Sequence, residues 1–342
     1  MIMKYIRLIS LSLAVYALLC LAGCSNVDEP SVRETSRHEI RFTSNLTGLD
    51  ADVTRAYGSF TTYNMGQKFW VWADMYDDQD DETTTYFNAW QLTVSSTTTK
   101  FSTNTTKMFP AYNKVSFYTL HGSFSEDFVE ETSEVVGSEW PEILTHTIKT
   151  TQITDNDYQL SDLVYAVNRN VVPTSEPVAL EFKHLLSQVE VALIAGSGLT
   201  ADNLTDASSS ARATVELLGV KTKVQFRPDK ANTMATYAER ELMLSNASDP
   251  DTITVATVVT DDVSKQVCGA AVVVPQTVNG KFIHIKYLDN DTYVKVNDLR
   301  LKSGYRYRFN VTVDRIGGEY SITPVTVAEW TSEPAEREAE LK

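Results

Sequence analysis

Cysteine is scarce in this sequence of 342 residues, which contains only three. Cys20 and Cys24 stand at the end of an apolar N-terminal run, and Cys268 stands alone in the apolar stretch VCGAAVVV. The sequence therefore offers no disulfide framework, and the fold must be held together by its hydrophobic core. We expect Cys268 to be a buried thiol.

Positive charge is also in deficit. The chain has 30 Lys and Arg residues against 45 Asp and Glu residues, a formal net charge of −15. A surface that binds phosphates needs clustered Lys and Arg, so this balance argues against nucleic acid as a partner. A strongly acidic surface is typical of a soluble protein whose copies repel one another.

Motifs for enzymatic chemistry are missing from the sequence. None of the five His residues stands in a Gly-x-Ser-x-Gly elbow, and there is no H-E-x-x-H motif, P-loop or G-x-G-x-x-G fingerprint. His284 alternates with Ile283 and Ile285, which is typical of a strand residue that faces away from an apolar layer. We therefore predict that the protein is not an enzyme and uses no cofactor.

The acidic run DMYDDQDDE, Asp74–Glu82, is the one local feature that suggests a metal. Its carboxylate oxygens could attract calcium, but the run lacks the central glycine and the terminal glutamate spacing of an EF-hand loop. We interpret it as the solvated tip of a β-hairpin.

The N-terminal apolar run is too short to span a membrane. It covers Leu8–Leu19, whereas a membrane-spanning helix needs about 20 apolar residues. Lys4 and Arg7 precede the run and small residues follow it, which is the pattern of a secretory signal peptide. We predict a signal peptide over residues 1–23.

The residues that end this run, Leu21-Ala22-Gly23-Cys24, resemble a bacterial lipobox. That resemblance implies cleavage before Cys24 and a lipid with palmitate-type acyl chains on its thiol. Cys24 is thus the predicted lipidation site, through which the lipoprotein is held in the cell outer membrane. The polar residues 24–37 are typical of a flexible tether.

From His38 onward, short runs of β-branched and aromatic residues alternate with loop signals. Helical periodicity is scarce, and only Phe182–Leu186 and Val296–Leu301 suggest helical turns. This pattern predicts an all-β protein built from antiparallel β-sandwiches. The clearest predicted strands are Ile40–Thr43, Phe69–Trp72, Val115–Tyr118, Leu163–Ala166, Val189–Leu193, Val215–Leu217, Ile253–Val255, Ala271–Val274, Phe282–Ile285, Tyr305–Val313 and Tyr320–Val327.

The chain is long enough for two domains. A polar stretch, Phe226–Thr236, contains Pro228 and is followed by enough residues for one sandwich. We therefore predict an N-terminal β-sandwich domain over residues 38–228 and a C-terminal one over residues 229–342.

Several motifs, taken in their order behind the lipobox, resemble the fimbrillin family of Bacteroides-type bacteria. The motifs are EIRF (39–42), VTRA (53–56), GQKFWV (66–71), SDLVYA (161–166), LEFKHLLSQVEV (180–191), LKSGYRYRFNV (301–311) and VAEW (327–330). The resemblance implies two transthyretin-like β-sandwich domains in a lipoprotein of the outer membrane. It also implies a structural or tip subunit of a fimbrium, or pilus, that acts in cell adhesion.

The family also implies how such subunits assemble. An arginine-specific protease cuts after an Arg that follows the first strand, and a strand from the next fimbrial subunit fills the groove by donor-strand insertion. Here the removable strand is His38–Leu46, with Ile40, Phe42 and Leu46 as its apolar residues, and the matching Arg is Arg55. The alternative is that Arg55 is an ordinary loop residue.

The C-terminal end departs from the family's pattern of a donor strand. The tail after Trp330, TSEPAEREAELK, has no alternating apolar pattern and contains Pro334. The donor could instead be Tyr320–Trp330. If that stretch belongs to the subunit's own sheet, the subunit can accept a donor but not give one, as expected of a tip subunit.

A second function remains open from the sequence alone, that of an outer-membrane lipoprotein that binds glycans at the surface. Four tryptophans, Trp70, Trp72, Trp90 and Trp140, could stack on sugar rings if they are exposed. Either function would involve a receptor on a host or bacterial surface.

Overall fold

The computed structural model describes residues 37–44, 66–77, 81–94, 101–204, 213–255, 257–259, 267–287, 290–314, 320–322, 326–330 and 337–338. The chain divides into two compact units, Met1–Arg37 and His38–Lys342. Every strand and helix named below belongs to the second unit. The predicted signal peptide and Cys24 lie outside the described residues.

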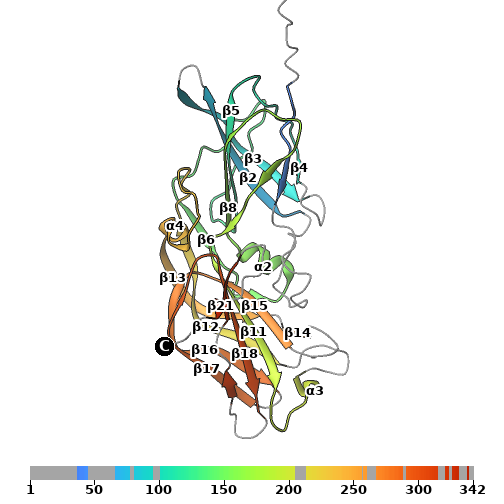
Figure 1. Cartoon of the computed structure of the whole chain (residues 1–342), viewed down its shortest axis with the longest axis vertical. Helices are drawn as coiled ribbons and strands as arrows, with labels where there is room; N and C mark the ends of the chain where they lie inside the picture. Colours follow the sequence, from blue (N-terminus) through green and yellow to red (C-terminus); the bar gives the residue numbers. More distant parts are fainter. Residues whose placement is uncertain are drawn as a thin grey trace, which may run out of the picture. The chain divides into compact units, whose positions relative to one another are not determined.

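The first sheet has six strands in the order β10-β8-β5-β2-β3-β4 (Figure 1). All its neighbouring strands run antiparallel. The strands are β2 (Lys68–Asp77), β3 (Glu82–Val94), β4 (Phe101–Thr103), β5 (Lys114–His121), β8 (Val164–Val171) and β10 (Lys183–His184). Asp77 pairs with Glu82 at the end of the β2–β3 hairpin, so the acidic run belongs to a hairpin as predicted. Asp74, its first residue, is not solvated but buried.

The second sheet has seven strands in the order β14-β15-β11-β18-β20-β21, with β19 also paired to β18. Its central pair, β11 and β18, is parallel, whereas its other neighbours are antiparallel. The strands are β11 (Ser187–Ala195), β14 (Val258–Val259), β15 (Val267–Val273), β18 (Tyr305–Val313), β19 (Tyr320–Ile322), β20 (Thr326–Glu329) and β21 (Arg337–Glu338).

The third sheet has six strands in the order β17-β16-β12-β13-β7, with β6 also paired to β12. The strands are β6 (Leu144–Thr147), β7 (Thr151–Gln152), β12 (Thr214–Phe226), β13 (Leu244–Val255), β16 (Gln276–Tyr287) and β17 (Asn290–Leu301). A separate two-stranded parallel pair is formed by β1 (Phe42–Ser44) and β9 (Val178–Leu180).

Three short helices are described: α2 (Asp155–Ser161), α3 (Ala201–Leu204) and α4 (Tyr237–Leu242). The hydroxyl of Thr154 caps α2, and Thr236 and Glu239 form a capping box at the start of α4. Such caps satisfy backbone N–H groups that have no partner within the helix. Among the described residues, none of the helices has the length and apolar character needed to cross a membrane.

Two clusters of buried side chains form the core. One lies between the first sheet and the β1–β9 pair and contains Phe69, Trp90 and Phe117. The larger one contains alternate residues of β11, β12, β16 and β18, so the second and third sheets enclose a common core. Strand β18 illustrates the alternation, since Tyr307, Phe309, Val311 and Val313 are all buried.

The predicted all-β fold is confirmed, and each predicted run coincides with or overlaps a strand of the structure. Two expectations were wrong: Val296–Leu301 forms the end of β17, and Phe182–Leu186 contains the strand β10, so neither is a helical turn. Cys268 is buried in β15, as predicted. The domain boundary at residue 228 stays a prediction; strands from both sides of it pair within the second and third sheets.

Candidate functional site

The first strand lies in a groove with backbone partners on both sides. The N–H of Ile40 donates to the Lys107 carbonyl at 2.9 Å, and the N–H of Phe109 donates to the His38 carbonyl at 2.8 Å. On the other side, the N–H of Val178 donates to the Arg41 carbonyl at 2.7 Å. Phe42–Ser44 then pairs in parallel with β9.

The side chains of this strand alternate between the core and the surface. Ile40 and Phe42 are only 2% and 5% exposed, whereas Glu39 and Arg41 point outward and are exposed. The ring of Phe42 packs edge-on against Phe117, with the ring centroids 5.2 Å apart. Burying two such side chains stabilises the fold by roughly 1.5–3 kcal/mol each, so the strand completes the smaller core cluster.

The last motif of the chain is held in the second sheet. Strand β20 pairs antiparallel with β18, and the N–H of Trp330 donates to the Gly304 carbonyl at 2.6 Å. The N–H of Gly304 in turn donates to the Leu186 carbonyl at 2.7 Å. Gly304 has a φ of 68°, a conformation that glycine adopts without strain.

Three of the sequence motifs meet at one polar cluster that sequence reasoning did not predict. The imidazole of His184 stacks on the indole of Trp330, with the ring centroids 3.8 Å apart. Its Nδ1 lies 2.8 Å from Oδ2 of Asp162, whose side chain is almost fully buried. These residues belong to the motifs SDLVYA, LEFKHLLSQVEV and VAEW, and their order along the chain was the only signal of this cluster.

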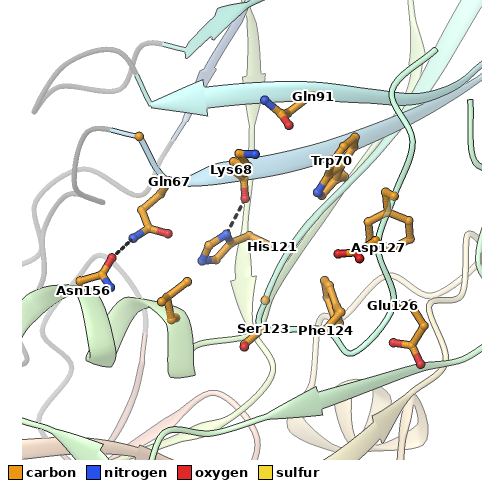
Figure 2. A pocket seen from close by; sticks show the side chains of 14 residues that line it. Gln67, Lys68, Trp70, Gln91, His121, Ser123, Phe124, Glu126, Asp127 and Asn156 are labelled. Carbon is orange, nitrogen blue, oxygen red and sulfur yellow. Dashed lines mark hydrogen bonds between the residues drawn. The ribbon is translucent and has the colours of Figure 1, made fainter.

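A pocket of about 610 Å³ opens beside the N-terminal half of β2 (Figure 2). Its lining comes from β2, β3, the segment after β5 and helix α2. The lining residues are Gly66, Gln67, Lys68, Trp70, Gln91, His121, Gly122, Ser123, Phe124, Glu126, Asp127, Phe128, Asn156 and Leu160. No sequence pattern indicated this pocket, apart from Trp70 among the tryptophans considered for sugar stacking.

Two buried histidines connect the pocket wall to helix α2. Nδ1 of His121 lies 2.6 Å from the Lys68 carbonyl. His146 accepts from the N–H of Ser123 at Nδ1, 3.0 Å away, and its Nε2 lies 3.0 Å from the Ser161 carbonyl. Burial lowers the pKa of both imidazoles, that of His146 to about 4. Both rings are therefore neutral at pH 7 and act as fixed hydrogen-bonding groups.

The tryptophans differ in exposure. Trp72 and Trp90 are buried, with 1% and 0% exposure, so neither is available to stack on a sugar. Trp140 and Trp70 are partly buried. Trp140 packs among Trp72, Tyr118 and Tyr165, and only Trp70 lines the pocket.

The other predicted site residues are placed as follows. Leu46 and Arg55 lie outside the described residues, as does Cys24, so their predicted roles stay predictions. His284 lies on β16, where its two ring nitrogens are 2.8 Å from Glu216 and Asp291. In the part of the chain that the structure describes, no group of three or more His, Cys, Asp or Glu side chains could hold a metal ion.

Comparison with known proteins agrees with the fold and identifies the family. No curated protein matches the chain. A protein assigned to cell adhesion from Bacteroides ovatus has a similar structure, with 15% sequence identity, a TM-score of 0.58, and coverage of 87% of this chain and 100% of that chain. A second such protein, from Bacteroides uniformis, shows 17% identity, a TM-score of 0.54, and coverage of 86% and 99%. At these identities the two structures support the fold alone.

The family model described as fimbrillin-like matches residues 54–330, which is most of the chain. The protein therefore belongs to the fimbrillin-like family and is a fimbrial protein of the cell surface.

Proposed function

We propose that this fimbrial subunit assembles by strand insertion and that residues 38–46 form the strand that is replaced. The observation that carries this proposal is the position of Ile40 and Phe42, which are buried in a groove between Lys107–Phe109 and β9. The partners of this strand, Lys107–Phe109 and β9, lie far from it in the sequence. The groove that they form is therefore not built from the residues that adjoin the strand. Such a groove suits exchange for a strand of another chain.

The groove left by removal of this strand would have defined requirements. The Lys107 carbonyl and the N–H groups of Phe109 and Val178 would lose their partners. The spaces now filled by Ile40 and Phe42 would open into the core. A replacing strand must therefore offer two apolar residues separated by one outward-facing residue, which fixes its register.

Cleavage after Arg55 would release the first strand together with the predicted lipid on Cys24. Two other arginines near the strand are poorer candidates. The guanidinium of Arg41 donates to the Ser175 carbonyl, and cleavage there would split the strand itself. Cleavage after Arg37 would leave the strand in its groove. In this proposal the lipid anchors the subunit in the outer membrane only until the protease acts.

The C-terminal strand supports a tip position in the fimbrium. Strand β20 and Trp330 are held by β18, Gly304 and His184, so they are engaged within the subunit's own sheet. A strand held in this way is not available as a donor. The subunit would thus accept a strand from the next subunit and give none.

Limited digestion with an arginine-specific protease tests the assembly proposal. We expect one early cut between Leu46 and Phe60, found by N-terminal sequencing of the product. The variant R55Q should resist this cut, whereas the control R37Q should be cut like the parent. The proposed role of Arg55 would be contradicted if the parent were not cut at all, or were cut only before His38.

Size-exclusion chromatography of the cleaved protein tests the tip position. Cleaved protein alone should stay monomeric, because it cannot donate a strand. It should form a complex with a synthetic peptide of alternating apolar residues, added in excess to fill the groove. Ladders of oligomers formed by the cleaved protein alone would contradict a tip position, and a peptide that binds the uncut protein equally well would contradict strand insertion.

The lipid on Cys24 is tested separately. In cells grown with an alkyne-labelled palmitate, the full chain should incorporate the label and fractionate with the outer membrane. The variant C24S should carry no label. The variant C20S is the matched control, because Cys20 leaves with the predicted signal peptide.

A further inference from the structure

The pocket beside Trp70 has walls that are held in place without a ligand. The segment after β5 is tied to β6 by backbone hydrogen bonds, from the Ser125 N–H to the Thr145 carbonyl at 3.0 Å and from the Thr147 N–H to the Ser123 carbonyl at 2.9 Å. Gly122 allows this close approach, because a Cβ there would lie 2.9 Å from Nδ1 of His146. The volume of the pocket, about 610 Å³, is within the usual range for small-molecule sites.

One wall of the pocket is aromatic. Trp70, Phe124 and Phe128 all line it and pack against the larger core cluster. Phe128 packs edge-on against Trp70 at 5.4 Å and against Phe124 at 5.9 Å, so the three rings fix one another. A rigid aromatic surface at a pocket wall can receive the C–H face of a ligand ring.

The lining of the pocket also contains polar groups. Figure 2 shows where Trp70, Gln91 and Asp127 lie in the pocket lining. Their indole N–H, amide and carboxylate make no hydrogen bond or ion pair with other described residues. Gln67 is only 7% exposed. Its amide nitrogen donates to the side-chain oxygen of Asn156 at 2.8 Å, and its own oxygen is turned toward the pocket (Figure 2). This amide oxygen is a hydrogen-bond acceptor, so it favours a ligand that donates a hydrogen bond.

The charges of the lining select among ligand classes. Glu126 is positioned by the N–H of Thr145, 3.1 Å away, and together with Asp127 it disfavours an anionic ligand. Lys68 in the same lining offsets one of these two negative charges. The side-chain amides and carboxylates suit a ligand with many hydroxyl groups, because hydroxyls both donate and accept hydrogen bonds.

We propose that this pocket binds a neutral carbohydrate, whose ring stacks on Trp70 while its hydroxyl groups bond to Asp127, Gln91 and Gln67. This gives the fimbrial subunit a sugar-binding site that is separate from the groove of the first strand. None of the pocket residues contributes to the core cluster that holds Ile40 and Phe42. Sugar binding and strand insertion can therefore fail independently.

Titration of the folded, uncut protein with small soluble probes tests the proposal. The neutral probes are glucose, galactose, mannose, N-acetylglucosamine and lactose, with sialyllactose as the anionic and spermidine as the cationic probe. Binding is followed by saturation-transfer NMR and by tryptophan fluorescence. We expect at least one neutral sugar to bind and to change the fluorescence, and sialyllactose and spermidine to bind at least about tenfold more weakly.

Variants then locate the binding site. D127N should weaken binding of the neutral sugar about tenfold, since a charge-assisted hydrogen bond is lost, and W70L should abolish the fluorescence change. E134Q is the matched control, because Glu134 is exposed on the same segment but outside the lining, and it should bind like the parent. If W70L does not fold, D127N and Q91A decide the outcome.

Three results would overturn the proposal. One is the absence of binding by every neutral probe. Another is tighter binding of spermidine or sialyllactose than of any neutral sugar. The third is binding that D127N and Q91A both leave unchanged, because the sugar would then occupy another site.

Discussion

The indole ring of Trp330 lies flat on the imidazole of His184, with an interplanar angle of 5° and 3.8 Å between the ring centroids. Trp330 directly follows strand β20, and His184 lies on β10 of the first sheet. The stack therefore joins the end of the second sheet to the first sheet. Asp162 lies 2.8 Å from Nδ1 of this imidazole and holds it in place. The contact explains how the short strand β20, of four residues, is kept in place.

Removal of this stack should loosen strand β20. Trp330 is only 8% exposed, and we expect W330A to lower the free energy of unfolding by about 3 kcal/mol. W330F should lose about 1 kcal/mol, because a smaller ring can still stack. Urea unfolding gives both values. The control Y112A, at a residue that is 73% exposed, should be neutral; an equal loss in all three variants would contradict the assigned role.

The first strand should carry a large share of the stability of the uncut subunit. We expect F42A to lower the free energy of unfolding by about 3 kcal/mol, because it leaves a cavity beside Phe117 and Trp90. E39A changes an exposed residue of the same strand and should cost less than about 0.5 kcal/mol. Urea unfolding measures both, and similar losses in both variants would show that side-chain burial does not hold the strand.

Stability should fall with acidification partly through His146. Its pKa is lowered to about 4 by burial, whereas in the unfolded chain it is near its ordinary value of 6.5. Between these values the unfolded chain binds a proton that the folded one does not, so unfolding is favoured as the pH falls. Above about pH 6.5 this contribution to stability is fully present.

The expected loss from this one group between pH 7 and pH 5 is about 2 kcal/mol. The variant H146Q should be less stable at pH 7 but should lose about 2 kcal/mol less than the parent over this interval. Urea unfolding at the two pH values gives the difference between parent and variant, in which the effect of other titrating groups cancels. An identical loss in both proteins would mean that His146 titrates normally in the folded state.

A partly buried ion pair connects β2 with the polar stretch after β12. Nζ of Lys230 lies 2.8 and 2.7 Å from the two carboxylate oxygens of Asp74 and packs over the rings of Tyr118 and Trp140. We expect K230A to lower the free energy of unfolding by about 2 kcal/mol, because Asp74 then stays buried without its partner. Urea unfolding measures this loss.

The matched control for this pair is Lys223 with Asp249, which lie 2.7 Å apart but are both about half exposed. K223A should leave the stability unchanged within error, because solvent screens an exposed pair. In a double-mutant cycle, D74N and K230A should show coupling, whereas the exposed pair should not. Equal effects of the two Lys variants would contradict the importance of burial.

Much of the fold could be predicted because strand patterns are local. Tyr305–Val313 shows strict alternation, and β18 has those bounds and buries the predicted face. Ile40 and Phe42 were likewise predicted to share one face, and both are buried. These predictions needed only the twofold periodicity of an extended chain.

Prediction from local patterns failed where an irregular strand changed the spacing of its apolar residues. In β17, Asp298 has a φ of 49°, and the pairing with β16 shifts its register between Val278 and Gly280. At this bulge β17 has one residue more than β16. Val296, Leu299 and Leu301 are therefore spaced as in a helical turn, although they lie in a strand. Helix α4 was not predicted, although the capping box at Thr236 and Glu239 is a local signal for the start of a helix. Its six residues are too few to show a helical pattern of apolar residues.

The all-β class, the core faces of the strands and the family to which the chain belongs can all be predicted from the sequence. The pairing of the strands cannot, and it is the folded chain that brings β1 against β9 and Trp330 onto His184. The folded chain also places Trp70 beside Asp127 and Gln91 in one pocket. The physical reason is that alternation records which side of a strand is apolar, whereas contacts between distant segments depend on how whole sheets pack and which loops they bring together.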